Sequence, residues 1–353
     1  MLTKQDIEKF YKETGKKLEI KDGKPYYGGN LDLRGTAITS LPDNLVVGGN
    51  LDLSFTAITS LPDNLVVGGL LDLRGTAITS LPDNLVVGDW LDLRGTAITS
   101  LPDNLVVGGN LNLYKTAITS LPDNLVVGDW LDLRGSAITS LPDNLVVGGL
   151  LDLQGIAITS LPNNLVVGGW LDLRGTAITS LPDNLVVGGS LDLYDTQFID
   201  ASNVKRNVPT LYEWHNGKYI KIDGIFSVVD SHHGNVYKVH QIGSTKQMYV
   251  VGDGNGKWAH GNTIDEARKD LIYKISNRDK SAYENLKLDS ILTFEEAIEC
   301  YRVITGSCAV GTKDYVENRL PKPHKEKYSI REMIELTKNE YQGKVFEEFF
   351  ANK

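Results

Sequence analysis

The sequence predicts a curved solenoid with one parallel β-sheet and an N-terminal helical cap, followed by a separate α+β domain. The solenoid is predicted by the triplet Leu-Asp-Leu, or Leu-Asn-Leu, which begins at residue 31 and returns every 20 residues up to residue 191. A fixed period of this size is typical of stacked repeats that bury a shared core. The separate domain is predicted because the period ends after Thr196, where alternating apolar and polar residues and then helix-start motifs follow.

Residues 1–29 are expected to form the cap, because a solenoid exposes its core at each end. An amphipathic helix is predicted over residues 1–17, with Ile7, Phe10 and Tyr11 on its apolar side. Thr3, followed by Asp6, resembles a helix start. The segment KLEIKDGKPYYGG has the composition of a strand and leads into the first full repeat.

Each repeat within residues 30–196 is expected to form one coil. In the repeat that begins at Leu91, Leu91 and Leu93 point inward and Asp92 points outward, because side chains alternate along a strand. Pro102 imposes an extended backbone on the far side of the coil, and Gly108 contributes to a turn. Further inward side chains are expected at Ile98, Leu101, Leu105 and Val107.

The pattern LDLRGTAITSLP resembles the short leucine-rich repeat of bacteria, in which L-x-L-x-x-N-x-L is followed by L-P. Its length is closest to the repeats of secreted effectors of enteric pathogens, although the ubiquitin-ligase domain that some of them carry is not evident here. Threonine stands where the family usually has asparagine, and the resemblance implies an inner ladder that hydrogen-bonds backbone groups between coils. The threonines of this ladder are Thr36, Thr56, Thr76, Thr96, Thr116 and Thr176. At the equivalent position Ser136 keeps a hydroxyl and Ile156 does not.

Six of the seven positions that vary among the eight full repeats surround the Leu-Asp-Leu strand. Drift at positions that packing does not constrain is one explanation. Recognition of a partner is favoured, because Ala97, Thr99 and Ser100 and their equivalents do not vary, and because tryptophan is rarely placed on a surface. Tryptophan, tyrosine and arginine also carry most of the energy of interfaces. The predicted partner-binding residues are Trp90, Trp130, Trp170, Arg74, Arg94, Arg134, Arg174, Tyr114, Tyr194, Asp92 and Asp132.

Charge narrows the class of partner. Residues 31–190 contain sixteen Asp and six Lys or Arg, a net charge of −10, so the negative charge of the chain, −9 in total, lies on the repeats. An acidic surface repels phosphate backbones, so nucleic acid is not expected on the repeats. A protein or peptide is favoured, and a carbohydrate remains open. The stacked Asp and Arg columns are also explained if they simply neutralise each other, and no calcium site is expected.

The rest of the chain is divided at residue 217. Residues 197–216 are expected to form a degenerate last coil or a linker, since Leu211 falls twenty residues after Leu191. Residues 217–353 are expected to form the α+β domain, beginning with an antiparallel meander whose turns lie at His233–Asn235, at Gly243 and at Gly254–Gly256. Three capping boxes predict helices, at Thr263/Glu266, Thr293/Glu296 and Ser329/Glu332. This region resembles an uncharacterised domain found beside such repeats in phage and gut-bacterial proteins, which implies no particular activity.

Two residues of this domain raise the possibility of catalysis. Cys308 precedes a predicted helix, whose dipole lowers thiol pKa values, and His260 lies at a predicted strand end. A Cys–His nucleophile requires both side chains within hydrogen-bond reach. A buried cysteine and an ordinary histidine are favoured instead, so no catalytic residue is assigned. Neither a metal nor another cofactor is expected, because His232 and His233 are adjacent and the GDGNG segment at 252–256 has the features of a hairpin turn.

The sequence thus predicts a binding protein that recognises a protein or peptide through the concave face of its repeats, with the C-terminal domain as a docking or effector module. The alternative is an enzyme with a Cys308/His260 site, for which the repeats select the substrate. The chain has no apolar run of membrane-spanning length and only two cysteines. A cytoplasmic location, or delivery into a host cell without a cleaved signal peptide, is therefore expected, and no membrane partner.

Overall fold

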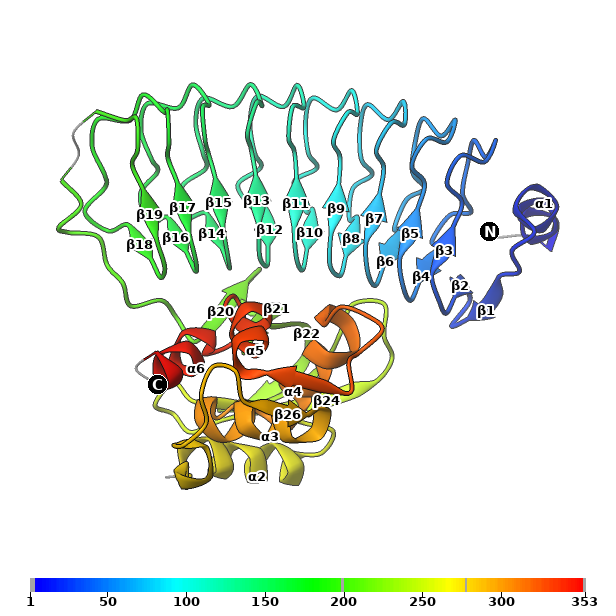
Figure 1. The fold of residues 1–353 in the computed structure, drawn as a ribbon. Coiled ribbons are helices and arrows are strands. Elements are labelled where there is room, and N and C mark those ends of the chain that lie inside the picture. The colour runs from blue at the N-terminus through cyan, green and yellow to red at the C-terminus, as the bar shows by residue number, and fades with distance from the viewer. Residues whose placement is uncertain (1–3, 198–199, 277, 352–353) are drawn as a thin grey trace. The chain divides into compact units, whose positions relative to one another are not determined.

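The computed structural model describes residues 4–197, 200–276 and 278–351. The chain forms two compact units, Met1–Pro209 with Gln241–Thr245, and Thr210–His240 with Lys246–Lys353. The first is a parallel β-solenoid with a 20-residue period, similar to a leucine-rich-repeat solenoid, and the second contains an antiparallel sheet and helices (Figure 1). The predicted fold class is therefore confirmed.

The N-terminal cap is small. Helix α1 (Lys4–Thr14) buries Phe10 against the solenoid core, and Ile7 packs beside it. Tyr11 is 54% exposed, so the expectation that it shares the apolar side is wrong: it lies about 100° around the helix from Phe10. Thr3 lies outside the described residues. The next segment forms a hairpin of β1 (Glu19–Lys21) and β2 (Lys24–Tyr27), and β2 pairs in parallel with the first coil.

The Leu-Asp triplets form a nine-stranded parallel sheet, here called the Leu-Asp sheet. Equivalent residues pair directly, as Leu91 does with Leu111, because every repeat has the same length. Its strands are β3 (Leu31–Asp32), β5 (Leu51–Asp52), β7 (Leu71–Asp72), β9 (Leu91–Asp92), β11 (Leu111–Asn112), β13 (Leu131–Asp132), β15 (Leu151–Asp152), β17 (Leu171–Asp172) and β19 (Leu191–Asp192).

A second parallel sheet, which was not expected, runs along the solenoid. Its Val-Val strands follow each Pro-Asp-Asn turn, and the second valine of each, such as Val107, points into the core. Short β-branched pairs favour such strands. After β1 and β2 the sheet contains β4 (Val46–Val47), β6 (Val66–Val67), β8 (Val86–Val87), β10 (Val106–Val107), β12 (Val126–Val127), β14 (Val146–Val147), β16 (Val166–Val167) and β18 (Val186–Val187).

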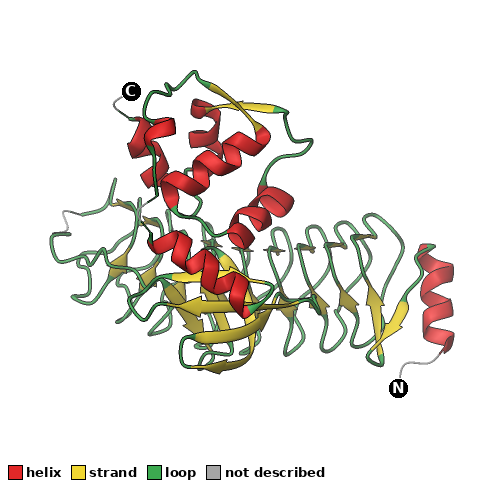
Figure 2. Cartoon of the chain, turned by 90° about the horizontal axis from the view of Figure 1, so that it is seen from below, coloured by secondary structure: helices red, strands yellow, loops and turns green. Residues whose placement is uncertain are grey.

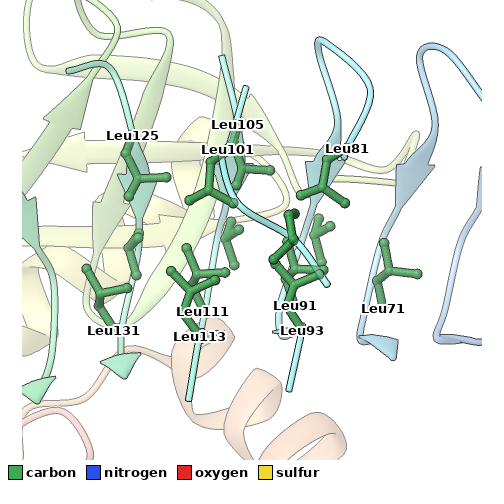
Figure 3. Close-up of a cluster of buried hydrophobic side chains, with 14 of the residues drawn as sticks. Leu71, Leu81, Leu91, Leu93, Leu101, Leu105, Leu111, Leu113, Leu125 and Leu131 are labelled. Carbon is green, nitrogen blue, oxygen red and sulfur yellow. The ribbon is translucent and has the colours of Figure 1, made fainter. Parts of the chain in front are cut away.

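Leucines fill the space between the two sheets along the solenoid. Figure 3 shows those of the central coils, between Leu71 and Leu131. Leu91, Leu93, Ile98 and Leu105 are fully buried, as predicted. Burying one such side chain contributes about 1.5–3 kcal/mol. The coils are also joined through the backbone, as where the Leu91 amide donates to the Asn110 carbonyl at 2.8 Å. A single coil has no core of its own, so both its side-chain burial and its backbone hydrogen bonds depend on the neighbouring coils.

Close packing between coils explains why some positions never vary. A Cβ atom at Gly88 would lie 2.1 Å from the carbonyl oxygen of Gly68, so only glycine fits there. The threonine ladder differs from the expectation. Thr96 donates its hydroxyl to the carbonyl of Leu93 at 2.7 Å, within its own coil rather than between coils. Ser136 has a buried hydroxyl with no hydrogen-bond partner, and Ile156 fills the position with apolar atoms.

The solenoid continues slightly beyond the last Leu-Asp strand. Lys205 forms a parallel bridge with Val186, and its amide donates to the Leu185 carbonyl at 3.0 Å. Leu211 does not belong to a further coil, because it begins the sheet of the second unit. Residues 197–216 therefore contribute to both units.

The second unit begins with the predicted meander, in which each strand pairs antiparallel with the next (Figure 2, yellow). Its bounds are β20 (Leu211–Trp214), β21 (Tyr219–Ile222), β22 (Ile225–His233), β23 (Val236–His240), β24 (Gln247–Gly252) and β25 (Trp258–Gly261). A two-stranded sheet of β26 (Ile291–Thr293) and β27 (Lys327–Ser329) lies later in the chain.

The helices of this unit are α2 (Ile264–Ile275), η1 (Ser281–Tyr283), α3 (Phe294–Thr305), α4 (Ala309–Asp314), η2 (Tyr315–Arg319), α5 (Ile330–Thr337) and α6 (Gly343–Phe350). Thr293 and Ser329 form complete capping boxes at α3 and α5. Thr263 caps α2, but the Glu266 carboxylate bonds to the Asn262 amide instead of the cap. None of the helices in the described ranges has the length and apolar character needed to cross a membrane.

Candidate functional site

Three of the variable positions lie on the outward side of the Leu-Asp sheet, here called the outer face, whereas the variable position of Thr96 and Ile156 is buried. Side-chain alternation places the residue before each Leu-Asp-Leu triplet, the middle Asp of the triplet and the residue after the triplet on this side. In the coil of Leu91 these are Trp90, Asp92 and Arg94. All the residues predicted to bind a partner belong to such positions.

The Asp and Arg columns hold each other in place. Arg94 donates from Nε to Oδ1 of Asp92 at 2.9 Å and from Nη2 to Oδ2 at 2.6 Å. The Asp92 side chain is only 3% exposed, although it points away from the core. These hydrogen bonds raise the pKa of Arg94 and keep it charged. Matched bidentate pairing satisfies the carboxylate that the column buries.

Arginines also reach along the column to the next coil. Arg134 binds its own Asp132 and lies 3.1 Å from the carboxylate of Asp152, whose own coil has Gln154 in place of arginine. Burial raises the pKa of Asp152, and the Gln154 amide and Arg134 oppose that shift. Ion pairs of the same kind join Arg34 to Asp52 and Arg174 to Asp192 in the next coil. The charged columns are therefore explained by mutual neutralisation, without any partner.

The aromatic residues of the outer face differ in exposure. Trp90 and Trp130 are half-buried, and the indole Nε1 of each is buried without a hydrogen-bond partner. Trp170 is 40% exposed and Tyr194 is 78% exposed. Tyr114 is half-buried, and its ring lies 5.4 Å from the guanidinium of Arg134. Of these aromatic residues, Tyr194 is thus largely open and Trp170 is partly open, whereas the others are half-buried.

The sequence prediction missed Phe55. This residue replaces the glycine that follows the outward Arg in most coils, and it retains the left-handed backbone of that position, with φ 57°. A bulky residue in that conformation is an outlier that costs about 1–2 kcal/mol. Its ring is nevertheless 67% exposed. The signal was present in the sequence, because Phe55 is the one aromatic residue at a turn position that is otherwise glycine, lysine or aspartate.

The structure brings the two candidate catalytic residues together. Cys308, at the N-cap of α4, has its Sγ atom 3.8 Å from Nδ1 of His260 on β25. The Gly311 amide donates to the same sulfur at 3.2 Å. The thiol and the imidazole therefore lie close enough to interact, which the sequence alone did not establish.

Asp223 and Lys274 complete this cluster, and neither was expected there. Asp223 occupies the tight turn between β21 and β22, where Asp-Gly is favoured, with φ 51° at Asp223. Its carboxylate accepts a hydrogen bond from Lys274 at 2.6 Å, and Lys274 also donates to the Trp258 carbonyl at 2.9 Å. One ligand atom each from Asp223, His260 and Cys308 lie within 4.8 Å of one another.

Burial keeps the thiol and the imidazole neutral. Cys308 is 0% exposed, and desolvation raises its pKa to about 11. Desolvation, with a smaller effect of Lys274, lowers the pKa of His260 to about 3. His260 Nε2 is buried and has no hydrogen-bond partner. These shifts oppose the thiolate–imidazolium pair that a cysteine nucleophile uses.

A cavity of about 70 Å³ adjoins the cluster, lined by Asp223, Gly311 and Tyr341 among other residues. A Cβ at Gly311 would lie 3.1 Å from Cys308 Sγ, so a larger residue would crowd the sulfur at this position.

The remaining candidate segments are structural. His232 and His233 are exposed at the end of β22, and the His232 ring stacks on Tyr237. The GDGNG segment joins β24 to β25 as a hairpin, held by the Asp253 carboxylate. The chain matches no protein-family model, and it shows no significant similarity to a curated protein.

Proposed function

We propose that this chain is a binding protein that recognises a protein or peptide through the outer face of its solenoid, with the second unit as a docking or effector module. The observation that carries the proposal is Phe55, a largely exposed ring held in a backbone conformation that disfavours it. Strained residues of this kind cluster at functional sites. Most equivalent coils use glycine at this position, and the non-glycine residues that share its left-handed backbone, Lys115 and Asp195, are charged rather than aromatic.

The spacing of the open rings favours an extended partner. Trp170 stands six repeats beyond Asn50, the equivalent residue in the coil of Phe55. At about 4.8 Å per coil this separates Phe55 from Trp170 by roughly 29 Å. A small ligand does not reach both, whereas a protein interface or an extended peptide does.

The charge of the face supports the same class of partner. Its arginines are already bound to aspartates, so few cations remain to attract a polyanion. Nucleic acid is therefore not proposed. The resemblance to short bacterial leucine-rich repeats, and to effectors that act through proteins, agrees with a protein partner. A glycan remains the second class to test.

The test is a selection of displayed peptides on the immobilised full chain, followed by calorimetry with the best binder. We expect Phe55→Gly combined with Trp170→Ala to weaken binding at least about 30-fold, which is about 2 kcal/mol. Phe55→Gly alone should not lower stability, since it relieves the left-handed strain.

The matched control is the pair Ser100→Ala and Ser140→Ala, two exposed residues at invariant positions outside the outer face. These changes should leave binding unaltered. Selected peptides that tolerate the aromatic changes and bind residues 210–353 would place recognition in the second unit. Selection of a glycan from an array, with no peptide binder, would transfer the proposal to carbohydrates.

An enzyme with Cys308 as nucleophile remains the alternative, and the 3.8 Å contact with His260 favours it. Burial of both side chains and the neutral state of each oppose it. We therefore place recognition first.

A further inference from the structure

The strongest unexplained feature of the second unit is the buried group of Asp223, His260 and Cys308. Three elements far apart in the sequence each supply one member, the β21–β22 turn, strand β25 and the N-cap of α4. A carboxylate, an imidazole and a thiol are three of the four protein ligands that zinc uses most. Lys274 pairs with the Asp223 carboxylate, whereas Nε2 of the buried His260 has no hydrogen-bond partner among the described residues.

We propose that Asp223, His260 and Cys308 bind one Zn²⁺ ion. Tetrahedral zinc with sulfur at about 2.3 Å and nitrogen at about 2.0–2.1 Å places those two ligand atoms about 3.6 Å apart. The Sγ and Nδ1 atoms lie 3.8 Å apart, so a contraction of about 0.2 Å suffices at this pair. The carboxylate is already inside the same 4.8 Å group.

The chemistry of the ligands selects a borderline metal. A thiolate and an imidazole favour Zn²⁺ over Mg²⁺ or Ca²⁺, which prefer oxygen ligands. On binding, the Cys308 thiol releases its proton to solvent and a Zn–S bond forms. The thiolate and the Asp223 carboxylate then balance the two charges of the ion.

The groups that hydrogen-bond the proposed ligands can hold them in position for a metal ion. Lys274 holds Oδ2 of Asp223 and fixes the carboxylate, as groups around zinc ligands commonly do. The Gly311 amide donates to Sγ, which favours a thiolate. The charge of Lys274 opposes the metal, but its ammonium is bound to the Trp258 carbonyl and lies over the Tyr341 ring at 4.1 Å.

Three protein ligands leave one position of a tetrahedral ion for water or a substrate atom. That count is typical of catalytic rather than structural zinc. Asp223 also lines the 70 Å³ cavity, which makes the cavity the natural place for the fourth ligand.

The experiment measures metal in the full chain, purified under reducing conditions from zinc-supplemented cells. We expect about one zinc per chain by elemental analysis, and an X-ray absorption spectrum with one sulfur at about 2.3 Å and nitrogen or oxygen at about 2.0–2.2 Å. In the Co²⁺-substituted chain a sulfur-to-cobalt absorption band should appear. These measurements on the unaltered chain do not depend on a variant that folds.

Variants then assign the ligand. Cys308→Ala should remove the cobalt band and lower the zinc content to below about 0.1 per chain. Cys300→Ala is the matched control, because Cys300 is also a fully buried thiol but lies in a different core cluster, and it should change neither. Asp223→Asn provides a second loss of affinity if Cys308→Ala does not fold.

Two results overturn the proposal. One is a chain that takes up no zinc and shows no sulfur-to-cobalt band, especially if Cys308 is alkylated rapidly in a reaction that requires His260, which would favour the nucleophile. The other is zinc that remains bound in Cys308→Ala, which would place the metal elsewhere.

Discussion

The ring of Phe55 lies against Gly75 of the next coil: a Cβ atom at Gly75 would be 2.7 Å from the Cδ1 atom of the ring. The same relationship recurs three coils further on, where Lys115 would contact a Cβ at Gly135 at 3.0 Å. A side chain at this turn therefore depends on a glycine in the following coil. At this turn, the residues of neighbouring coils are therefore not independent of one another.

This dependence predicts that Gly75→Ala costs more stability than Gly95→Ala. Both glycines have a left-handed φ, 67° and 71°, so each substitution carries a strain of about 1 kcal/mol. Only Gly75 faces a ring, since nothing lies within 4 Å of a Cβ at Gly95. Urea unfolding of the full chain measures the difference, which should disappear when Phe55 is also changed to Gly. An equal cost for both substitutions would show that the ring does not hold this position.

The ion pairs of the outer face predict a second asymmetry. Arg94→Ala should cost about 1–3 kcal/mol, because it leaves the nearly buried Asp92 carboxylate without its main partner. The double change Asp92→Asn with Arg94→Tyr should cost less, since the neighbouring coil has Asn112 and Tyr114 at these positions and the Tyr114 backbone amide donates to Asn112 Oδ1. Chemical denaturation of the two variants tests this, and a harmless Arg94→Ala would contradict it.

The repeat architecture could be predicted from the sequence because period, triplet and turn agree in every coil. Leu91 and Leu93 are buried as expected. The second sheet was missed because two valines are too short a run to distinguish a strand from a loop. The burial of Asp92 was also missed. Side-chain alternation predicts that Asp92 points away from the core, but it does not predict that neighbouring side chains cover it.

The second unit shows a different limit. Its meander and helix caps were predictable from local patterns. The cluster of Asp223, His260 and Cys308 was only partly predictable, because Cys308 and His260 are 48 residues apart and Asp223 appeared only as a turn residue. Contacts across such separations depend on tertiary packing, which no local pattern encodes. Phe55 is the opposite case, since its local signal was visible.

Glu332 predicts a pH effect at the N-terminus of α5. Its carboxylate accepts hydrogen bonds from Lys325 and from the Ser329 amide, and these lower its pKa to about 2. A lowered carboxyl pKa stabilises the fold above the ordinary pKa of about 4.3, and the contribution is lost as the pH falls toward 2. Glu332→Gln should therefore flatten the pH dependence of unfolding between about pH 5 and pH 2. A carboxyl titration by NMR with an ordinary midpoint at Glu332 would contradict the assignment.

The division of the chain predicts where a stable fragment begins. Residues 210–353 should unfold cooperatively on their own, because apart from the loop 241–245 they form one compact unit with its own buried clusters. A fragment of residues 217–353 lacks β20, which pairs with β21, and also lacks the buried Trp214. It should lose about 3–5 kcal/mol relative to the longer fragment, as expected for removal of a large core side chain. Thermal unfolding followed by circular dichroism compares the two. Equal stability would show that β20 contributes nothing to this unit, and an unfolded 210–353 fragment would show that the unit requires the solenoid.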